Sequence, residues 1–278
     1  MTLRALVAVA LALAPSIARA DAKADATKAF TDFITSLATE KPALSDLEAF
    51  LPLYLDRAPV PVATDVKSTL EAPKLKVLRA DVSKSGTSVW IVAEVKTKSV
   101  KVFDDATKNV TLRASGFLVL DKGAWHVRAA DLSRAVEDKP ADPNCGNASH
   151  QWGLEKAPPK ALAATVRMTL TAVDQGKSHA ALLSDSKNTL VLGSAPGEQF
   201  AGAAAKGVKK WQIRSSGNSD DDANIRALAG IGPDADLMWI AAPISGPAKL
   251  CTEYRGFFVL AKEASGWKIV HEHYSSPL

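Results

Sequence analysis

The sequence predicts an α+β protein of two tandem domains, each with helices packed on a curved antiparallel sheet. Three observations support this. In each half, apolar residues at helical spacing precede a block of short β-rich runs. The two β-rich blocks repeat each other, and a segment rich in Pro, Asn, Asp and Gly separates them. Helices and strands that are segregated along a chain are typical of α+β domains. At 278 residues the chain is long enough for two ordinary domains, each with its own core.

The first twenty residues have the pattern of a secretory signal peptide. Arg4 precedes an apolar run over Leu6–Leu13, and residues 18–20 (Ala-Arg-Ala) fit the small-x-small cleavage rule. The run is shorter than the roughly 20 apolar residues that a membrane-spanning helix needs. We therefore expect cleavage after Ala20, export to the periplasm or the medium, and no stable membrane insertion of the mature chain. A buried or amphipathic N-terminal helix is the alternative.

The charge balance disfavours polyanionic partners. The chain has 34 Lys and Arg against 30 Asp and Glu, and loss of Arg4 and Arg19 with the signal peptide would leave 32 against 30. Neither half carries the basic excess that binding to a phosphate backbone requires. Nucleic acid and anionic membrane are therefore not expected partners. We expect a small apolar ligand or a protein partner instead, and the sequence leaves the oligomeric state open.

Two cysteines occur, Cys145 and Cys251. An even number of cysteines in an exported chain favours a disulfide. The bridge would close a loop of about 100 residues, which stabilises a fold by up to roughly 4–5 kcal/mol in the chain-entropy model. Two separate buried thiols are the alternative. Two cysteines alone do not support a metal site, and no phosphate-binding Gly loop or His-Glu-x-x-His motif occurs. We therefore expect no cofactor.

Helices are predicted near the start of the first half. An apolar stripe with the spacing i, i+3, i+4, i+7 consists of Ala26, Ala29, Phe30, Phe33, Ile34 and Leu37. Further along, Ser45 and Glu48 have the spacing of a capping box before Leu47, Phe50 and Leu51. This pattern predicts a second, short helix that Pro52 limits.

Two helices are also predicted at the start of the second half. Pro158 and Pro159 precede an apolar stripe that consists of Leu162, Val166, Leu170 and Val173. Gly176 is suited to end this helix, because glycine readily adopts the left-handed conformation that follows many helices. A shorter helix is expected over His179–Leu183.

Three β-rich runs in the first half recur in the second, in the same order. The run WIVA at 90–93 recurs as WIAA at 239–242, GFLVL at 116–120 as GFFVL at 256–260, and the closing run at 125–133 as 267–275. Each run has the composition of a strand, with turn residues between runs. We interpret the repeat as a domain duplication. The boundary is expected near residue 142, within a linker over 137–159, which gives domain 1 over 21–142 and domain 2 over 143–278.

The second half carries two further motifs, LGSAPGE at 192–198 and the closing run WKIVHEHYSSP at 267–277, with Gly202 and Trp211 between them. In these motifs, over about residues 158–278, it resembles the SnoaL-like branch of the nuclear transport factor 2 (NTF2)-like superfamily. The first half is connected to that branch only through the repeat. The resemblance implies a cone-shaped fold, in which a bent antiparallel sheet encloses a pocket against helices. The superfamily includes isomerases, dehydratases, cyclases, epoxide hydrolases and non-catalytic proteins, so the fold does not decide function.

The closing strand of the second half holds the first candidate site residues. Period-two alternation places His271 and His273 on one face with Trp267, Ile269 and Ser275. The opposite face receives Lys268, Val270, Glu272 and Tyr274. Because Trp267 and Ile269 are apolar, the histidine face is expected to point into the pocket. Two histidines there suit general acid–base chemistry, supply two of the ligands that a metal needs, or serve as hydrogen-bonded structural side chains.

The repeat limits this chemistry to one half. His271 aligns with Ala129 and His273 with Asp131, so the first half lacks both imidazoles. Asp131 would suit a general base if buried, and a surface or capping role is the alternative.

Other candidates are isolated residues in the second half. Glu198 lies in a Pro-Gly turn, where its carboxylate would either stabilise the turn or face the pocket. Trp211 and Tyr254 would line the pocket or pack in the core. The leading hypothesis is an exported, non-catalytic tandem protein that binds a small apolar ligand or a partner. The alternative is an isomerase, dehydratase or cyclase that uses His271, His273 and Glu198 in domain 2.

Overall fold

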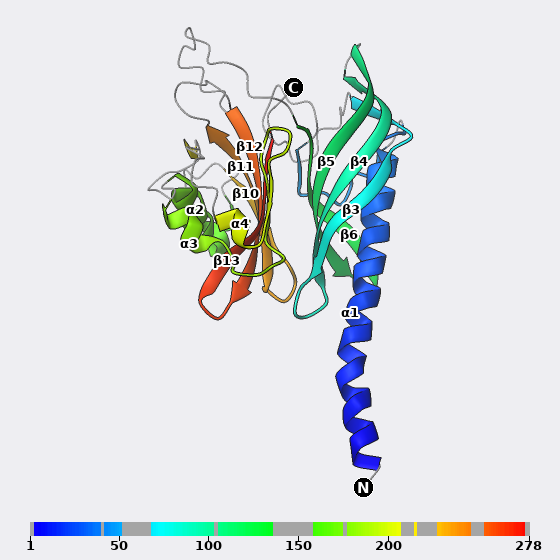
Figure 1. Ribbon diagram of the computed structural model, residues 1–278, viewed down its shortest axis with the longest axis vertical. Coiled ribbons are helices and arrows are strands. Elements are labelled where there is room, and N and C mark those ends of the chain that lie inside the picture. Colours follow the sequence, from blue (N-terminus) through cyan, green and yellow to red (C-terminus); the bar gives the residue numbers. More distant parts are fainter. Residues whose placement is uncertain are drawn as a thin grey trace.

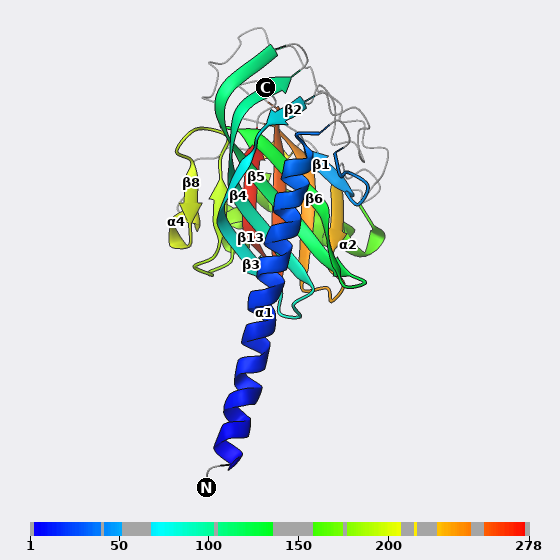
Figure 2. The same ribbon diagram turned by 90° about the vertical axis from the view of Figure 1, so that its right-hand side faces the viewer.

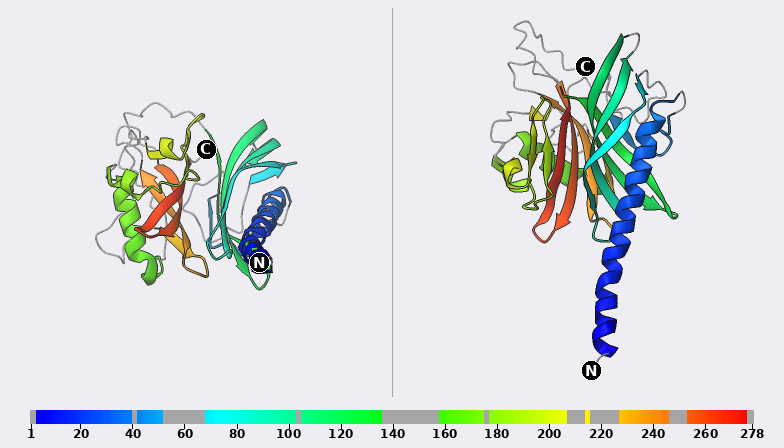
Figure 3. Two further views of the ribbon diagram at one scale, coloured as in Figure 1. Left: turned by 60° about the horizontal axis from the view of Figure 1, so that its bottom comes forward. Right: turned by 45° about the vertical axis from the view of Figure 1, so that its right-hand side comes forward.

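The structure, a computed structural model, describes residues 3–39, 42–51, 68–102, 105–135, 158–174, 177–206, 214–215, 227–245 and 253–275. These residues form two mixed β-sheets that lie face to face, one from each half of the chain. Helices cover the outer side of each sheet (Figures 1 and 3). The result is four layers, in the order helix, sheet, sheet, helix.

The first helix, α1 (Leu3–Ser36), packs on the outer side of the first sheet with its C-terminal half, and its N-terminal half extends beyond the sheets (Figures 1 and 2). The predicted apolar stripe is confirmed, because Phe30, Phe33 and Ile34 are buried in the core of the first half. Ala20 lies within this helix, and its cleavage stays a prediction. Among the described residues, no helix is long and apolar enough to span a membrane.

The first sheet contains six strands among the described residues: β1 (Ala49–Leu51), β2 (Ser68–Glu71), β3 (Lys74–Val82), β4 (Ser88–Val102), β5 (Asp105–Asp121) and β6 (Ala124–Arg134). The order is β1-β6-β5-β4-β2, and β3 also pairs with β4. The meander from β3 to β6 is antiparallel, whereas β1 is parallel to β6. The expected all-antiparallel sheet is therefore corrected to a mixed sheet.

Strand β1 replaces the short helix that the Ser45–Glu48 capping box predicts, so that prediction is wrong. The backbone N–H of Glu48 donates to the Arg128 carbonyl at 2.6 Å, and the following residues pair with β6. Phe50 packs in the core of the first half, while Ala49 and Leu51 face the other sheet. This alternation suits a strand buried on both faces, so tertiary pairing overrides the local helix signal.

The second half begins with α2 (Lys160–Asp174) and α3 (Lys177–Leu182), which confirm the two predicted helices. The remaining elements are β7 (Leu190–Leu192), β8 (Gln199–Ala201), α4 (Ala203–Lys206), β9 (Arg214–Ser215), β10 (Leu228–Ile231), β11 (Leu237–Ser245), β12 (Glu253–Glu263) and β13 (Gly266–Ser275). The sheet order is β10-β11-β12-β13-β7-β8, β9 pairs with β11, and β7 is parallel to β13. Except for the extra β8, this order corresponds strand by strand to that of the first sheet. The predicted linker and the boundary near residue 142 lie outside the described residues, apart from Pro158 and Pro159.

The three repeated runs lie on equivalent strands, but the middle run is displaced. Both closing hairpins start alike, with Asp121 opposite Ala124 and Glu263 opposite Gly266. Counted from these turns, Phe117 is equivalent to Val259, and each lies opposite the tryptophan of the preceding strand. GFLVL and GFFVL are therefore two residues out of structural register. A shift of two keeps every side chain on the expected face, so the faces survive the misalignment.

Three apolar clusters hold the layers together. One lies between α1 and the first sheet, and a second lies between the helices of the second half and the second sheet. The third lies between the two sheets, where Trp90 and Val92 of β4 face Trp239 and Phe257 of β11 and β12. Both sheets therefore bury both faces.

Candidate functional site

The side chains of β13 change faces at a β-bulge. Ile269 lies opposite Leu260 and His271 lies opposite Val259, so Val270 is an extra residue. Ile269 packs in the core of the second half, whereas His271 faces the first sheet. The prediction that the histidines share the face of Trp267 and Ile269 is therefore wrong. A bulge inserts one residue and reverses the alternation beyond it.

His271 and His273 lie fully buried between the sheets, in a polar cluster within the apolar interface. The Ser115 hydroxyl is 2.8 Å from Nε2 of His271 and 2.9 Å from Nδ1 of His273. The Ser133 hydroxyl is 2.7 Å from Nε2 of His273, and Nδ1 of His271 is 2.8 Å from the Leu190 carbonyl oxygen. The His271 ring also stacks on Trp90 at 5.3 Å.

The Leu190 carbonyl fixes the direction of this chain of hydrogen bonds. A carbonyl only accepts, so Nδ1 of His271 donates to it, and Nε2 of the neutral ring accepts from Ser115. Ser115 has then used its single proton, so Nδ1 of His273 donates to Ser115. Nε2 of His273 accepts from Ser133 in turn. The arrangement satisfies both neutral imidazoles completely, which is how buried polar groups persist.

Asp131 lies beside this chain. It is 1% exposed, its Oδ2 accepts a hydrogen bond from Ser275 at 3.1 Å, and the same oxygen is 3.9 Å from Nδ1 of His273. Of the two alternatives for Asp131, the buried one is correct. Counted from the hairpin turns, Asp131 and His273 are equivalent residues. Equivalent residues meet in this way where a two-fold axis passes through an interface.

Burial dominates the protonation of this cluster. It lowers the pKa of His271 to about 4, although the hydrogen bond that His271 donates to the Leu190 carbonyl raises it. Burial also lowers the pKa of His273 well below its ordinary value, and the nearby His271, Arg113 and Arg255 act in the same direction. Burial raises the pKa of Asp131 to about 7, although Arg255 and the hydrogen bond from Ser275 oppose it. At neutral pH both histidines are therefore uncharged.

The outer, helix-covered face of β13 carries a second polar cluster, which the sequence did not predict. Beyond the bulge, Glu272 and Tyr274 point toward α3 instead of away from it. Nε2 of His179 on α3 donates to one oxygen of the Glu272 carboxylate, and the Tyr274 hydroxyl donates to the other at 3.3 Å. Glu272 is fully buried, whereas the His179 side chain is 11% exposed. The cluster therefore reaches the surface only at His179.

Charge stabilises this His179–Glu272–Tyr274 cluster. Burial alone would lower the pKa of His179, but the Glu272 charge and its hydrogen bond outweigh burial and raise that pKa above its ordinary value. Burial, the Glu272 charge and the hydrogen bond to it raise the pKa of Tyr274 well above its ordinary value. Tyr274 therefore stays a donor at any physiological pH.

The first half has no such cluster at the equivalent positions. Counted from the hairpin turns, Ala130 takes the place of Glu272, and Leu132 takes that of Tyr274. Both are buried in the apolar core under α1. In the sequence, only His179 pointed to this cluster, because a histidine in the predicted short helix does not contribute to an apolar face. The bulge that turns Glu272 toward α3 has no sequence signature of its own.

Glu198 stabilises a turn. Its Oε2 accepts a hydrogen bond from the Ala195 backbone N–H at 2.9 Å, and its side chain lies against Gly193 so closely that a Cβ there would come within 2.1 Å of Oε2. Arg113 of β5 donates to the carbonyls of Gly193 and Ala195 from the other half. The LGSAPGE motif therefore forms part of the contact between the halves.

The remaining predicted residues divide into two groups. Tyr254 of β12 is buried on the helix-covered face of the second sheet, in the same apolar cluster as Tyr274. Trp211, Cys145 and Cys251 lie outside the described residues, so the disulfide stays a prediction. Within the part of the chain that the structure describes, no three His, Cys, Asp or Glu side chains are placed to hold a metal ion.

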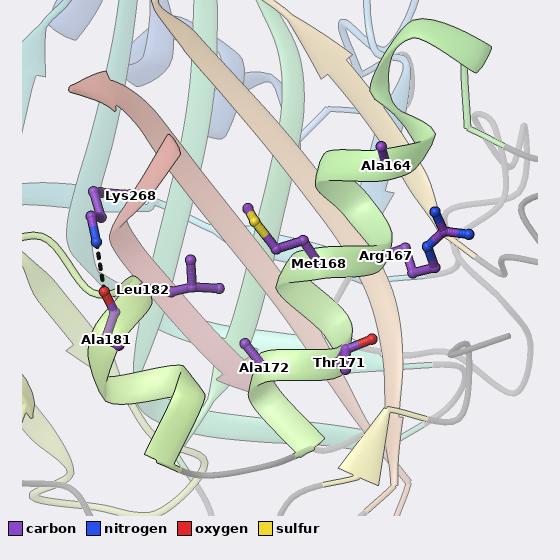
Figure 4. A pocket seen from close by; sticks show the side chains of 8 residues that line it. All are labelled: Ala164, Arg167, Met168, Thr171, Ala172, Ala181, Leu182 and Lys268. Atoms are coloured by element: carbon purple, nitrogen blue, oxygen red, sulfur yellow. Dashed lines mark hydrogen bonds between the residues drawn. The ribbon is translucent and has the colours of Figure 1, made fainter. Parts of the chain in front are cut away.

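An open groove of about 650 Å³ lies beside α3 (Figure 4). Its lining comes from α2, α3 and β13 and consists of Ala164, Arg167, Met168, Thr171, Ala172, Ala181, Leu182 and Lys268. Among the described residues, the lining contains two cationic residues and no acidic one. Nζ of Lys268 donates to the Ala181 carbonyl at 2.7 Å, and Met168 is 42% exposed.

No protein-family model and no curated protein matches the chain. Similar solved structures include an NTF2-like protein of unknown function from Pseudomonas putida KT2440, with 17% identity, 43% of this chain and 89% of that chain covered, and a TM-score of 0.31. An NTF2-like protein from Cytophaga hutchinsonii has 17% identity, coverages of 42% and 95%, and a TM-score of 0.32. A DUF3225-family protein of unknown function from Pectobacterium atrosepticum has 16% identity, coverages of 42% and 85%, and a TM-score of 0.27. At these TM-scores the likeness assigns neither a function nor a family to this chain.

Proposed function

We propose that this chain is an exported protein of two fused NTF2-like domains, in which domain 2 binds a small ligand without transforming it and domain 1 is a scaffold. The observation that carries the proposal is the His179–Glu272–Tyr274 cluster between α3 and the outer face of the second sheet. An ionisable cluster that is buried there and reaches the surface at a single histidine has the character of a binding site.

The equivalent positions in the first half support this assignment. A buried charged pair is costly and is seldom retained for stability alone, since well-packed apolar residues often serve equally well. Ala130 and Leu132 show that this fold accepts apolar residues at the positions of Glu272 and Tyr274. The fold does not require the polar cluster, so we assign it to function.

Duplication, branch and export belong to the same proposal. The corresponding strand orders, the equivalent bulges in β6 and β13 and the meeting of Asp131 with His273 support a duplicated domain. The motifs at 192–198 and 267–277 support the SnoaL-like branch, and the pattern of residues 1–20 supports export to the periplasm or the medium.

Native mass spectrometry of the protein from its own source tests the proposal. We expect a bound small molecule that the wild-type protein retains and His179→Gln loses. His126→Gln, an equivalent change at a histidine that pairs with Asp46 in the first half, is the matched control and should keep the molecule. A bound molecule that survives both His179→Gln and Glu272→Gln would contradict the assignment of the site.

The His179–Glu272 pair also favours a second candidate, an enzyme of the isomerase, dehydratase or cyclase type. A histidine oriented by a carboxylate is a common general acid–base arrangement. The released molecule separates the two functions. Binding without catalysis predicts that a ligand incubated with fresh protein returns with unchanged mass and stereochemistry. Conversion that Glu272→Gln abolishes would establish the enzyme instead.

A further inference from the structure

The Glu272 carboxylate presents no unsatisfied oxygen to a ligand. One oxygen accepts from His179 and the other accepts from Tyr274, and the residue is fully buried. A ligand that reaches this cluster therefore meets His179, the only member with solvent exposure. The hydrogen bond to Glu272 occupies Nε2, so Nδ1 is the nitrogen that remains for a ligand.

His179 presents a donor at this position. The Glu272 carboxylate holds a proton on Nε2, and the charged ring carries a second N–H on Nδ1. The neighbours of His179 favour the charged ring, because Glu272 raises its pKa. Donors recognise acceptors, and a charged donor binds a charged acceptor more strongly than a neutral one.

The surroundings of α3 add an apolar and cationic environment. Leu182, one turn along α3 from His179, packs on the core that contains Phe258 and Tyr274. The groove beside α3 is lined by Arg167 and Lys268 and, among the described residues, by no acidic side chain (Figure 4). A ligand near α3 therefore meets apolar surface together with positive charge.

We propose that the ligand of domain 2 is an amphipathic carboxylate, an apolar chain or ring system whose carboxylate accepts a hydrogen bond from Nδ1 of His179. This rests on the proposed function and specifies the chemistry of that same site. The buried Glu272 serves as a positioning residue, since it fixes the His179 ring and its proton without contacting the ligand.

Isothermal titration of the full mature chain with three eight-carbon probes tests the proposal. Octanoate carries the expected carboxylate, 1-octanol is its neutral counterpart, and octylamine is its cationic counterpart. We expect octanoate to bind about tenfold or more tightly than 1-octanol, as a charge-assisted hydrogen bond allows. Octylamine should not bind measurably. His179→Gln should remove the preference for octanoate, and His126→Gln should keep it.

The pH dependence separates positioning by Glu272 from a structural role. The charged group that acts on the pKa of His179 is Glu272 on β13, and Tyr274 stays neutral. Lys268 on β13 and Arg167 on α2 line the groove beside α3. Octanoate affinity should fall as pH rises through the pKa of His179. Glu272→Gln removes the group that raises this pKa, so the same loss should occur at lower pH. If Glu272→Gln does not fold by circular dichroism, His179→Gln carries the test.

Each result bears on one claim. Equal affinity for octanoate and 1-octanol overturns the carboxylate inference and leaves ligand binding by domain 2 intact. Octanoate binding that His179→Gln does not weaken overturns the inference too. Binding of none of the three probes also overturns it, and the proposed function then depends on the native bound molecule alone.

Discussion

His271 and His273 are neutral at neutral pH because burial lowers the pKa of both imidazoles. The Leu190 carbonyl orders the protons along His271, Ser115, His273 and Ser133, and an added proton on either ring would require one hydroxyl to reverse. Next to this chain, burial favours the protonated form of Asp131. The two kinds of group therefore respond to acid with opposite signs.

The sign of the histidine contribution follows from the lowered pKa. The folded-state pKa of His271 is about 4, and that of His273 is also lowered, so their contribution is fully present above the unfolded pKa near 6.5. It is lost as pH falls from that value toward the folded pKa. Asp131 acts oppositely, because its pKa rises to about 7 on folding, and its contribution is lost as pH rises from about 4 to 7.

The variant Asp131→Asn separates the contribution of the histidines to the pH dependence of stability from that of Asp131. Between pH 4.5 and 6 the unfolded wild-type chain gains two protons at the histidines and lacks one that folded Asp131 holds. In the variant only the two histidines take up protons on unfolding. Its unfolding free energy should therefore fall more steeply on acidification, by about 1.4 kcal/mol more per pH unit. Urea unfolding at several pH values measures both slopes. A slope for Asp131→Asn no steeper than that of the wild type would contradict a protonated Asp131 in the folded protein.

The sequence predicted that His271 and His273 lie on one face of their strand, but not that this face meets the first sheet. Alternation correctly placed His271, His273 and Ser275 together, since they lie on the same side of the bulge. The partners Ser115 and Ser133 are more than a hundred residues away in sequence, and no local pattern connects them to the histidines. Glu272 was assigned to the wrong face for the same reason that the histidines were.

Among the elements, β1 and the two bulges show where local patterns fail. The helices α1 and α2 follow from apolar spacing, because each needs one apolar face and the pattern shows that face directly. Strand β1 depends on β6, which lies about eighty residues later. A capping box competes poorly with a parallel pairing that buries Phe50 on one side and Leu51 on the other.

Two substitutions distinguish a strand from a capped helix at this place. Ser45 is exposed, so Ser45→Ala should change the unfolding free energy by less than about 0.5 kcal/mol, whereas loss of a helix cap typically costs about 1 kcal/mol. Leu51 is fully buried between the sheets, and Leu51→Ala should cost about 2–5 kcal/mol. Urea unfolding measures both. A cost near 1 kcal/mol for Ser45→Ala would instead indicate that Ser45 caps a helix and would contradict the strand.

For the whole molecule, the sequence indicated two similar halves but not how they associate. A signal for their association was nevertheless present. The runs at 90–93 and 239–242 are apolar without interruption, and such runs are typical of strands buried on both faces. Trp90 and Trp239 occupy the face that meets the other sheet, and Ile91 and Ile240 occupy the face under the helices. Both halves therefore need each other to bury their apolar strands.

This mutual burial predicts one cooperative unfolding transition for the whole chain. Calorimetry of the wild-type protein should show a single peak, because separation of the halves would expose the apolar cluster between the sheets, including Trp90 and Phe257.

Val92→Asp places a carboxylate at a fully buried position of that interface and leaves the two outer cores intact. It should split the peak into two, since each half then unfolds separately. Lys96 is exposed on the same strand, so the control variant Lys96→Asp should keep a single peak. Two peaks in the wild type, or one in Val92→Asp, would show that the contact between the sheets does not couple the halves.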